Sequence, residues 1–227
     1  MSADNPYNTP QSALSENGNI SDIEEMAGND SLLNRRTFFI REHVGLLKLS
    51  DTYDILDPAN QNQLGIAKEK PGAFVHILRF LVNKTLLPTV VHVYEGSDPE
   101  NERNRLFSIR KKVALFRPVV NVEEPNGNVV GWFKSKAFSL GGAFRVFDAK
   151  GNEIALIKGD WKGWNFKFTD NAKKEIGSIT KKWAGIGKEL FTSADNYMIS
   201  LSEKTNPAHA VLLLAAGLAI DTVYKER

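Results

Sequence analysis

The most uniform pattern in the chain is an apolar run near the C-terminus. Between Ala208 and Ile220 only His209 is polar, and the surrounding residues are mostly the helix formers Ala and Leu. Pro207 precedes the run, where the first turn of a helix tolerates proline, and charged residues follow it. An amphipathic surface helix would show a polar stripe, which this run lacks. The pattern predicts a helix at about 207–224 with apolar surroundings on every side.

Two environments would suit such a helix, a lipid bilayer or the interior of the protein. A bilayer span needs about 20 apolar residues, and this run is shorter and ends in a charged tail. A buried core helix is therefore the favoured interpretation, and a membrane anchor formed by residues 208–224 is the alternative. A core helix needs enough strands upstream to enclose it.

Upstream of the helix, short β-forming runs are separated by turn residues about every ten positions. These runs predict strands at residues 37–41, 53–57, 64–68, 89–95, 106–113, 121–124, 129–134, 144–148, 153–158, 166–170 and 175–181. One segment differs, because apolar residues at helical spacing predict a short helix at 72–82. This helix would lie outside the sheet or close one end of it.

A hairpin recurs four times in this pattern, each copy consisting of a strand, a tight turn and a returning strand. In each copy an acidic residue precedes a small residue by seven positions, or by eight in the first copy. The pairs are Asp57 with Gly65, Glu124 with Gly131, Asp148 with Ala155, and Asp170 with Gly177. We expect the acid to accept a hydrogen bond from a turn amide, while Asn-Gly and Gly-Asn pairs supply the positive φ that such turns need. The small residue permits a close approach, as expected where a sheet bends around another element.

Alternate residues of the predicted strands are apolar, as from Phe144 to Phe147, so one face of the sheet is buried and the other is wet. Successive hairpins with one dry face, followed by an apolar helix, predict a closed antiparallel β-barrel around the helix. Closure would also remove exposed sheet edges. The predicted fold class is mainly β.

The N-terminal segment has a different composition. Residues 1–34 are rich in Asn, Ser, Asp and Gly and poor in apolar side chains. Such a stretch cannot bury enough surface to offset the entropy lost on ordering, so we expect a disordered acidic tail. The barrel domain is expected to span residues 35–227.

The composition limits which catalytic and metal sites the protein can have and indicates its cellular location. The chain has no cysteine, which excludes disulfides, thiolate metal sites and cysteine nucleophiles. Its first residues lack the basic start and apolar core of a secretory signal, so a cytoplasmic location is predicted. The histidines at positions 43, 76, 92 and 209 are dispersed, and no catalytic or phosphate-loop motif is present. We therefore expect no catalytic residue, no cofactor, no metal site and no enzymatic activity.

The net charge of +2 conceals an uneven distribution. Residues 1–34 contain acidic residues and no Lys or Arg, whereas residues 134–188 carry twelve Lys or Arg against five Asp or Glu, a local charge of +7. A basic surface favours phosphate-rich partners, either anionic lipid headgroups or nucleic acid. No nucleic-acid-recognition motif is present, so nucleic acid is not expected as a partner.

Lysines and tryptophans of this region are the candidate lipid-headgroup-binding residues, because Lys supplies charge and Trp prefers a boundary between polar and apolar surroundings. They are Lys162, Lys167, Lys173, Lys174, Lys181, Lys182, Lys188, Trp164 and Trp183. The alternative is that the tryptophans belong to the barrel core and the lysines only keep the surface solvated.

Residues 176–224 carry a resemblance to a known family. The segment from Gly177 to Gly185 fits the string G-x-I-x-K-x-W-x-G, and the segment from Phe191 to Tyr197 fits F-T-x-A-D-N-F/Y. Followed by an apolar helix, they look like the C-terminal part of the phospholipid scramblase family. The repeated hairpins fit the wider Tubby-like superfamily, which contains the LURP-one-related proteins.

This resemblance implies a barrel of about twelve strands around a central C-terminal helix, and a membrane-associated role at the inner face of the membrane. Scramblase relatives are linked to calcium-activated movement of phospholipids between leaflets, and Tubby relatives bind phosphoinositides through a basic patch. The segment similar to the family's calcium loop runs from Ser193 to Lys204. Its degenerate positions, including Ser193, Asp195 and Asn196, offer one carboxylate opposite a lysine, so we expect it not to bind calcium.

Two functions follow as hypotheses. The first is a scramblase-family protein that associates with anionic membrane lipids and assists bidirectional phospholipid movement. The alternative is a soluble Tubby-like interaction or scaffold module without lipid transport, in which a partner protein docks on the barrel.

Overall fold

The computed structural model of the protein describes residues 31–43, 51–72, 87–112, 119–135, 142–160, 163–181 and 196–224, except the side chains of 222–224. The strands of the described part are Thr37–Glu42 (β1), Thr52–Leu56 (β2), Gln63–Glu69 (β3), Thr89–Glu95 (β4), Arg105–Lys111 (β5), Val119–Glu123 (β6), Val129–Ser135 (β7), Ala143–Asp148 (β8), Glu153–Asp160 (β9), Asn165–Thr169 (β10), Glu175–Thr180 (β11) and Tyr197–Leu201 (β12). Its helices are the 3-10 helices Leu32–Asn34 (η2) and Glu102–Asn104 (η4) and the α-helix Pro207–Tyr224 (α3).

The strands form a closed antiparallel barrel in which each strand pairs with its neighbours in the sequence. Closure occurs between β1 and β12, where Phe38 stands opposite Ile199. Apolar and polar positions alternate across the wall, as in β10, where Phe166 and Phe168 are buried and Lys167 between them is exposed. The mainly β fold class and the closed barrel that the hairpin pattern predicts are confirmed.

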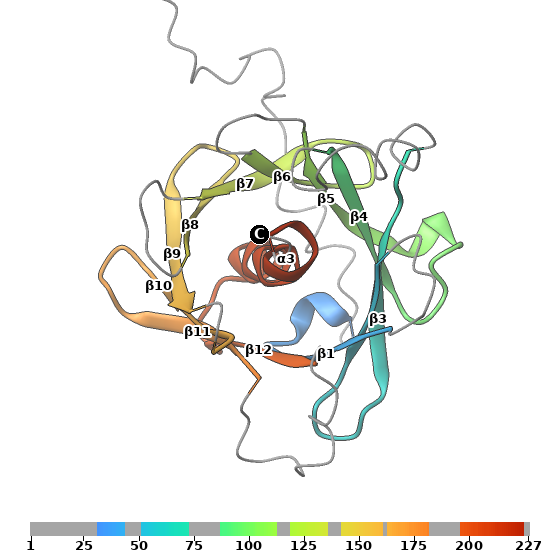
Figure 1. Cartoon of the computed structure of the whole chain (residues 1–227), viewed down its shortest axis with the longest axis horizontal. Coiled ribbons are helices and arrows are strands. Elements are labelled where there is room, and N and C mark those ends of the chain that lie inside the picture. The colour runs from blue at the N-terminus through green and yellow to red at the C-terminus, as the bar shows by residue number, and fades with distance from the viewer. Residues whose placement is uncertain are drawn as a thin grey trace, which may run out of the picture.

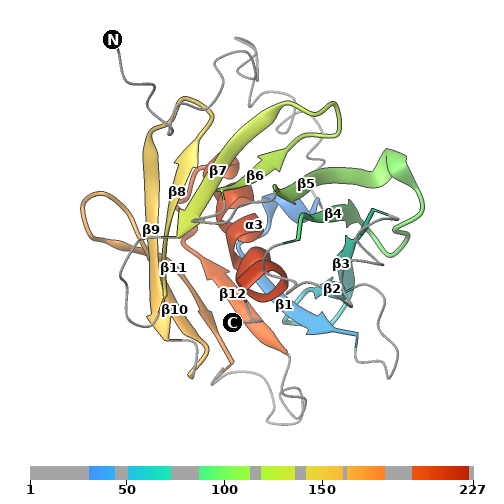
Figure 2. The same ribbon diagram turned by 45° about the horizontal axis from the view of Figure 1, so that its top comes forward.

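Helix α3 lies inside this barrel, as the view along it in Figure 1 and the turned view in Figure 2 both show. Residues 210–220 are all buried, so the helix is the core rod that its uniformly apolar sequence predicts. Among the residues that the structure describes, no helix has both the length and the apolar character that crossing a bilayer requires.

The repeated hairpins share one turn geometry. In three copies the N–H of the acidic residue donates to the carbonyl four positions later, and its own carbonyl accepts from the N–H three positions later. That third position has a positive φ in each copy, at Gly127, Gly151 and Lys173. The side chains of Asp148 and Asp170 also accept the amide N–H four positions later, at 2.8 and 2.9 Å. In the first copy the Asp57 side chain accepts the Ala59 N–H at 2.8 Å, so the role predicted for the acid is confirmed in three of the four copies.

The small residue of the repeat makes room for the elements inside the barrel. A Cβ atom at Gly131 would lie 2.5 Å from the carbonyl oxygen of Phe147 and 2.6 Å from Cδ2 of Leu212 on α3. At Gly65 it would lie 2.6 Å from Cδ1 of Leu32 on η2. Neither position has space for a side chain, so the glycines set how closely the helices approach the wall.

Helix η2 is an element that the sequence pattern does not predict, and it shares the interior with α3 (Figure 1). Leu32 and Leu33 are buried, and the Glu95 carboxylate at the end of β4 accepts hydrogen bonds from the Leu32 N–H, at 2.9 Å, and the Ser31 hydroxyl, at 3.1 Å. Residues 31–34, which the sequence pattern assigns to the tail, thus pack inside the barrel. The rest of the predicted tail lies outside the described residues.

Strand β12 is also missing from the strands that the hydrophobic pattern predicts, although the family resemblance implies a twelfth strand. Tyr197 and Ile199 point into the core, but Met198 between them is equally buried, against Phe39 and Leu56 on the outer side of the wall. A strand buried on both faces shows no alternation from which it could be recognised. The helix predicted at 72–82 lies outside the described residues.

A chain that ends at Thr205 is expected to lose cooperative folding. The large aliphatic side chains that α3 buries are Val211, Leu212, Leu213, Leu214, Leu218 and Ile220. At about 1.5–3 kcal/mol each, their burial contributes roughly 9–18 kcal/mol, against a typical net stability of about 5–15 kcal/mol. Near-ultraviolet circular dichroism and urea unfolding measure the outcome. A truncated chain that stays monomeric and unfolds cooperatively would contradict the enclosed helix.

Substitution of Gly131 by Ala should destabilise the fold by about 1–3 kcal/mol, because the added methyl group meets a backbone oxygen and α3. Urea unfolding measures the change. The matched control is Gly72→Ala, since a Cβ there meets nothing within 4 Å and should change stability by less than about 0.5 kcal/mol. Equal effects at the two positions would argue against close packing of α3 on β7.

Candidate functional site

Four cationic side chains form a band across the outer face of β7 to β10. Lys134 stands directly opposite Arg145, and Lys158 stands directly opposite Lys167. Arg145 pairs with Leu156, which makes Lys158 its diagonal neighbour at about 7 Å between Cβ atoms. At least one neighbour of each cation along its strand lies in the core, so the four side chains point outward. We call Lys134, Arg145, Lys158 and Lys167 the basic band.

The basic band carries more positive charge than the described carboxylates neutralise. Glu153 lies 3.7 Å from Arg145, and Glu175 lies 2.8 Å from Lys167. Lys134 and Lys158 form no ion pair with any residue in the described ranges. Because like charges that face each other on adjacent strands repel, an anion placed between them would relieve an unfavourable contact.

Aromatic rings support one end of the basic band. Trp132 and Phe147 stack on the outer face with 3.9 Å between ring centroids, and the Lys134 ammonium lies 5.2 Å from each centroid. A cation over aromatic faces at an exposed site gains about 0.5–1 kcal/mol. The rings therefore help to hold this ammonium group at the surface while leaving it accessible.

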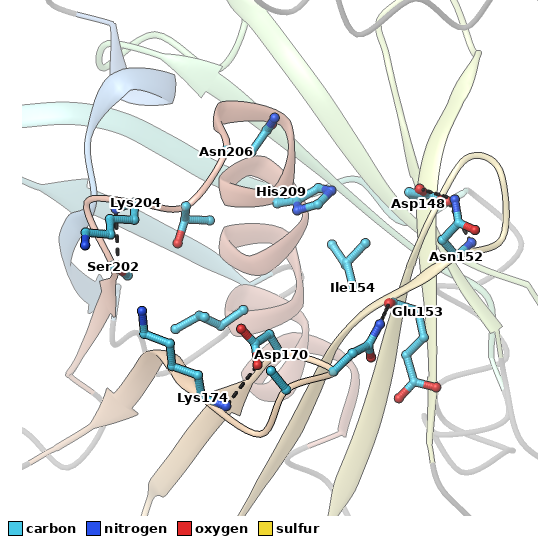
Figure 3. Close-up of a pocket in the computed structure, with 14 residues that line it drawn as sticks. Asp148, Asn152, Glu153, Ile154, Asp170, Lys174, Ser202, Lys204, Asn206 and His209 are labelled. Carbon is cyan, nitrogen blue, oxygen red and sulfur yellow. Dashed lines mark hydrogen bonds between the residues drawn. The ribbon is translucent and has the colours of Figure 1, made fainter.

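A pocket of about 650 Å³ opens at the end of the barrel where α3 begins. It lies between the β8–β9 turn, the β10–β11 turn and the segment that joins β12 to α3 (Figure 3). Lys174 and Lys204 lie on one side of it, Asp148 and Glu153 lie on the other, and His209 of α3 lies between them. Two half-buried isoleucines supply apolar surface. The pocket thus presents both signs of charge around an apolar part.

The pattern of strands and apolar helix is that of a known family. A family model described as Scramblase matches residues 49–227. The chain belongs to the scramblase family. The match covers β2 to β12 and α3, so the resemblance predicted on residues 176–224 is confirmed and extends over most of the barrel. The scramblase family is not a typical enzyme family. None of the curated proteins and none of the solved structures compared with the chain matches it.

The structure of this scramblase-family protein separates the candidate lysines. Of those described, Lys167 lies in the basic band, while Lys173 and Lys174 lie exposed in the β10–β11 turn, where Lys174 lines the pocket. The Lys181 ammonium lies 4.6 Å from the ring of Trp164. The candidates outside the described residues are Lys162, Lys182, Lys188 and Trp183.

Trp164 occupies a core position, as the alternative interpretation of the tryptophans predicts. Its side chain is 9% exposed, and its ring lies 5.2 Å from that of Tyr197. Of the degenerate calcium segment, Asn196 is buried just before β12, and Ser193 and Asp195 lie outside the described residues. Within the described ranges, no group of three His, Asp or Glu side chains could hold a metal ion.

Sequence reasoning missed Lys134, Arg145 and Lys158 as members of one site. Each stands at an outward position of an alternating strand, and this parity can be read from the sequence. Their cross-strand pairing could have been found from the turn lengths, because equal turns fix the register of successive hairpins.

The outer face of β3 to β5 lies on the opposite side of the barrel from the basic band (Figure 1). Carboxylates neutralise the cations on that face. Glu100 pairs with Lys68, and the Glu102 carboxylate lies 2.8 Å from the Lys70 ammonium and 2.9 Å from the Arg105 guanidinium. Hydrogen bonds from Lys70 and from the Tyr94 hydroxyl lower the pKa of Glu102 to about 2, so this carboxylate stays ionised. The face therefore offers less free positive charge than the basic band.

His92 on β4 belongs to the same neutralised cluster, where a 2.7 Å hydrogen bond joins its Nδ1 to the Ser108 hydroxyl. Burial, and then the charge of Arg105, lower the pKa of His92 from 6.5 to about 4. His92 is therefore neutral in the folded protein at pH 7.

Stability should fall as the pH is lowered from about 6.5 to about 4, because the unfolded state then binds a proton at His92 that the folded state does not. Urea unfolding of the wild type and of His92→Gln across this range measures the contribution. The difference in free energy of unfolding between the two proteins should be constant above pH 7. Below pH 6.5 the wild type should lose stability relative to His92→Gln. A pH-independent difference would show that His92 titrates alike in both states.

Proposed function

We propose that this scramblase-family protein binds the surface of anionic phospholipid membranes through the basic band and, once bound, assists the movement of phospholipids between leaflets. The observation that carries the proposal is two cross-strand pairs of like charge, Lys134 with Arg145 and Lys158 with Lys167, that carboxylates only partly neutralise. A headgroup phosphate placed at either pair gains the attraction of the cation, Lys134 or Lys158, that no described carboxylate neutralises.

The strength of this interaction suits a peripheral protein. Each Lys or Arg near an anionic membrane contributes about 1 kcal/mol, so the four residues of the basic band supply roughly 4 kcal/mol before the costs of binding. Such binding is weak, reversible and reduced by salt. Because the cytoplasmic leaflet carries the anionic lipids, the inner face of the membrane is the proposed location.

The site of lipid movement follows from how the barrel is filled. Helices α3 and η2 and the inward side chains of the strands occupy the interior, and the core residues are at most 9% exposed. A lipid headgroup has no route through this packed core. The proposed movement therefore takes place where the outer surface of the barrel contacts the bilayer.

Co-sedimentation with vesicles tests the proposal. The full chain should bind vesicles of phosphatidylcholine and phosphatidylserine, and binding should weaken steeply between 50 and 300 mM salt. The double substitution Lys134→Gln with Lys158→Gln removes the two cations of the basic band that form no ion pair with a described residue, and it should weaken binding on the order of 30-fold, at about 1 kcal/mol for each cation. Dithionite quenching of a fluorescent lipid in the same vesicles reports movement between leaflets.

A control with equal loss of charge is Lys68→Gln with Lys70→Gln, because these lysines already pair with Glu100 and Glu102. It should weaken binding less than the substitutions in the basic band. Equal losses would show that net charge, not the basic band, drives binding. No binding of the wild type at 50 mM salt would remove the proposal and favour the soluble interaction module, and binding without lipid movement would remove its second part.

A further inference from the structure

The pocket at the start of α3 is lined by none of the four cations of the basic band and has a different charge pattern. It is large enough for a small ligand, since ligand pockets typically measure about 300–1,000 Å³. The turns that line it are the β8–β9 and β10–β11 turns of the repeated hairpin, closed by the segment before α3 (Figure 3). The same turn geometry therefore builds two walls of one cavity.

The start of α3 offers few free N–H groups, so positive charge in the pocket comes mainly from side chains. Pro207 has no N–H, and the N–H of Ala208 already donates to the Asn206 side chain at 2.9 Å. Lys174 and Lys204 supply the ammonium groups, and neither forms an ion pair with any residue that the structure describes. These two ammonium groups therefore attract an anionic group into the pocket.

Negative charge in the pocket stands opposite the lysines and along its lower edge (Figure 3). Both carboxylate oxygens of Asp148 accept hydrogen bonds from Asn152, so this acid is fixed in place. Asp170 accepts the Lys174 N–H through Oδ1 only, which leaves Oδ2 for a further donor. A cationic group in the pocket has an ordered acceptor in Asp148 and an open one in Asp170.

Neither a simple anion nor a simple cation suits this arrangement. A free phosphate would be attracted by the two lysines but repelled by Asp148 and Asp170. A simple amine would be attracted by the two aspartates but repelled by the lysines. A molecule with both charges gains both attractions.

We infer that this pocket binds a phosphate ester that carries a primary ammonium group, the chemistry of an ethanolamine phosphate headgroup. Lys174 and Lys204 hold the phosphate, Asp148 and Asp170 accept the ammonium protons, and Ile154 and Ile176 contact the carbon atoms between the two charges. The pocket and the basic band are separate sites, so this inference does not depend on the proposed function.

The inference is tested by measuring how tightly glycerophosphoethanolamine binds to the full chain in a nuclear magnetic resonance titration. It should bind at least about tenfold more tightly than inorganic phosphate or ethanolamine alone, because each of those meets one favourable and one unfavourable wall. Glycerophosphocholine should bind more weakly, since its quaternary ammonium has no proton to donate. Equal affinity for inorganic phosphate and glycerophosphoethanolamine would overturn the inference.

Substitutions locate the binding. Lys174→Gln with Lys204→Gln should weaken glycerophosphoethanolamine binding at least about tenfold, and Asp170→Asn should do so while still accepting the turn amide. The matched control is Lys173→Gln, the neighbouring exposed lysine, which does not line the pocket. It should leave binding unchanged. Equal effects of the control and the pocket variants would overturn the inference.

The two sites can be told apart in the same experiments. Lys134→Gln with Lys158→Gln should leave glycerophosphoethanolamine binding intact, and the pocket variants should still sediment with phosphatidylserine vesicles. Phosphatidylethanolamine vesicles distinguish a lipid from a free metabolite as the source of the headgroup. Tighter binding to these vesicles than to phosphatidylcholine vesicles would assign the pocket to lipid, whereas binding of glycerophosphoethanolamine alone would assign it to a soluble compound of the same chemistry.

Discussion

The need to fill a twelve-stranded barrel is the constraint on which the rest of the structure depends. Strands spaced about 4.8 Å apart and tilted by roughly 40° enclose a cylinder roughly 24 Å across at the backbone. An α-helix with its side chains is about 10–12 Å wide, which leaves about 6 Å on each side for the inward side chains of the strands. Helix α3 fills this space because residues 210–220 are apolar at every angle. A polar stripe would bury unpaired groups against the wall.

The sequence predicts a strand well where apolar and polar residues alternate along it. It predicts an element poorly where contacts with distant parts of the chain decide which side chains are buried. Alternation identifies β10, because its outward lysine contrasts with two phenylalanines. It misses β12, because Met198 is buried on the outer side of the wall. It misses η2, because Leu32 and Leu33 are too few to form a pattern and are held by a distant carboxylate, Glu95. Contacts between residues about sixty positions apart leave no local signal.

The candidate site shows the same division. Excess charge in residues 134–188 predicts a basic surface, but composition cannot say which cations face each other. That depends on register, which places Lys158 against Lys167 and Lys134 against Arg145. It also depends on whether each cation is neutralised. Lys68 and Lys70 also point outward, but they form ion pairs with Glu100 and Glu102. Trp164 illustrates the converse, because a tryptophan next to lysines in sequence packs inward against Tyr197.

The two ends of α3 have different surroundings. At the C-terminal end Asp221 is 3% exposed, and burial together with its charge raises the pKa values of Tyr53 and Tyr197, so both phenols stay neutral at physiological pH. At the N-terminal end the hairpin turns stand apart around a pocket of mixed charge. Because the core between them is packed, a ligand bound in the pocket does not reach Asp221 through the interior. The basic band and the pocket, the two proposed binding sites, therefore lie outside the packed core that encloses α3.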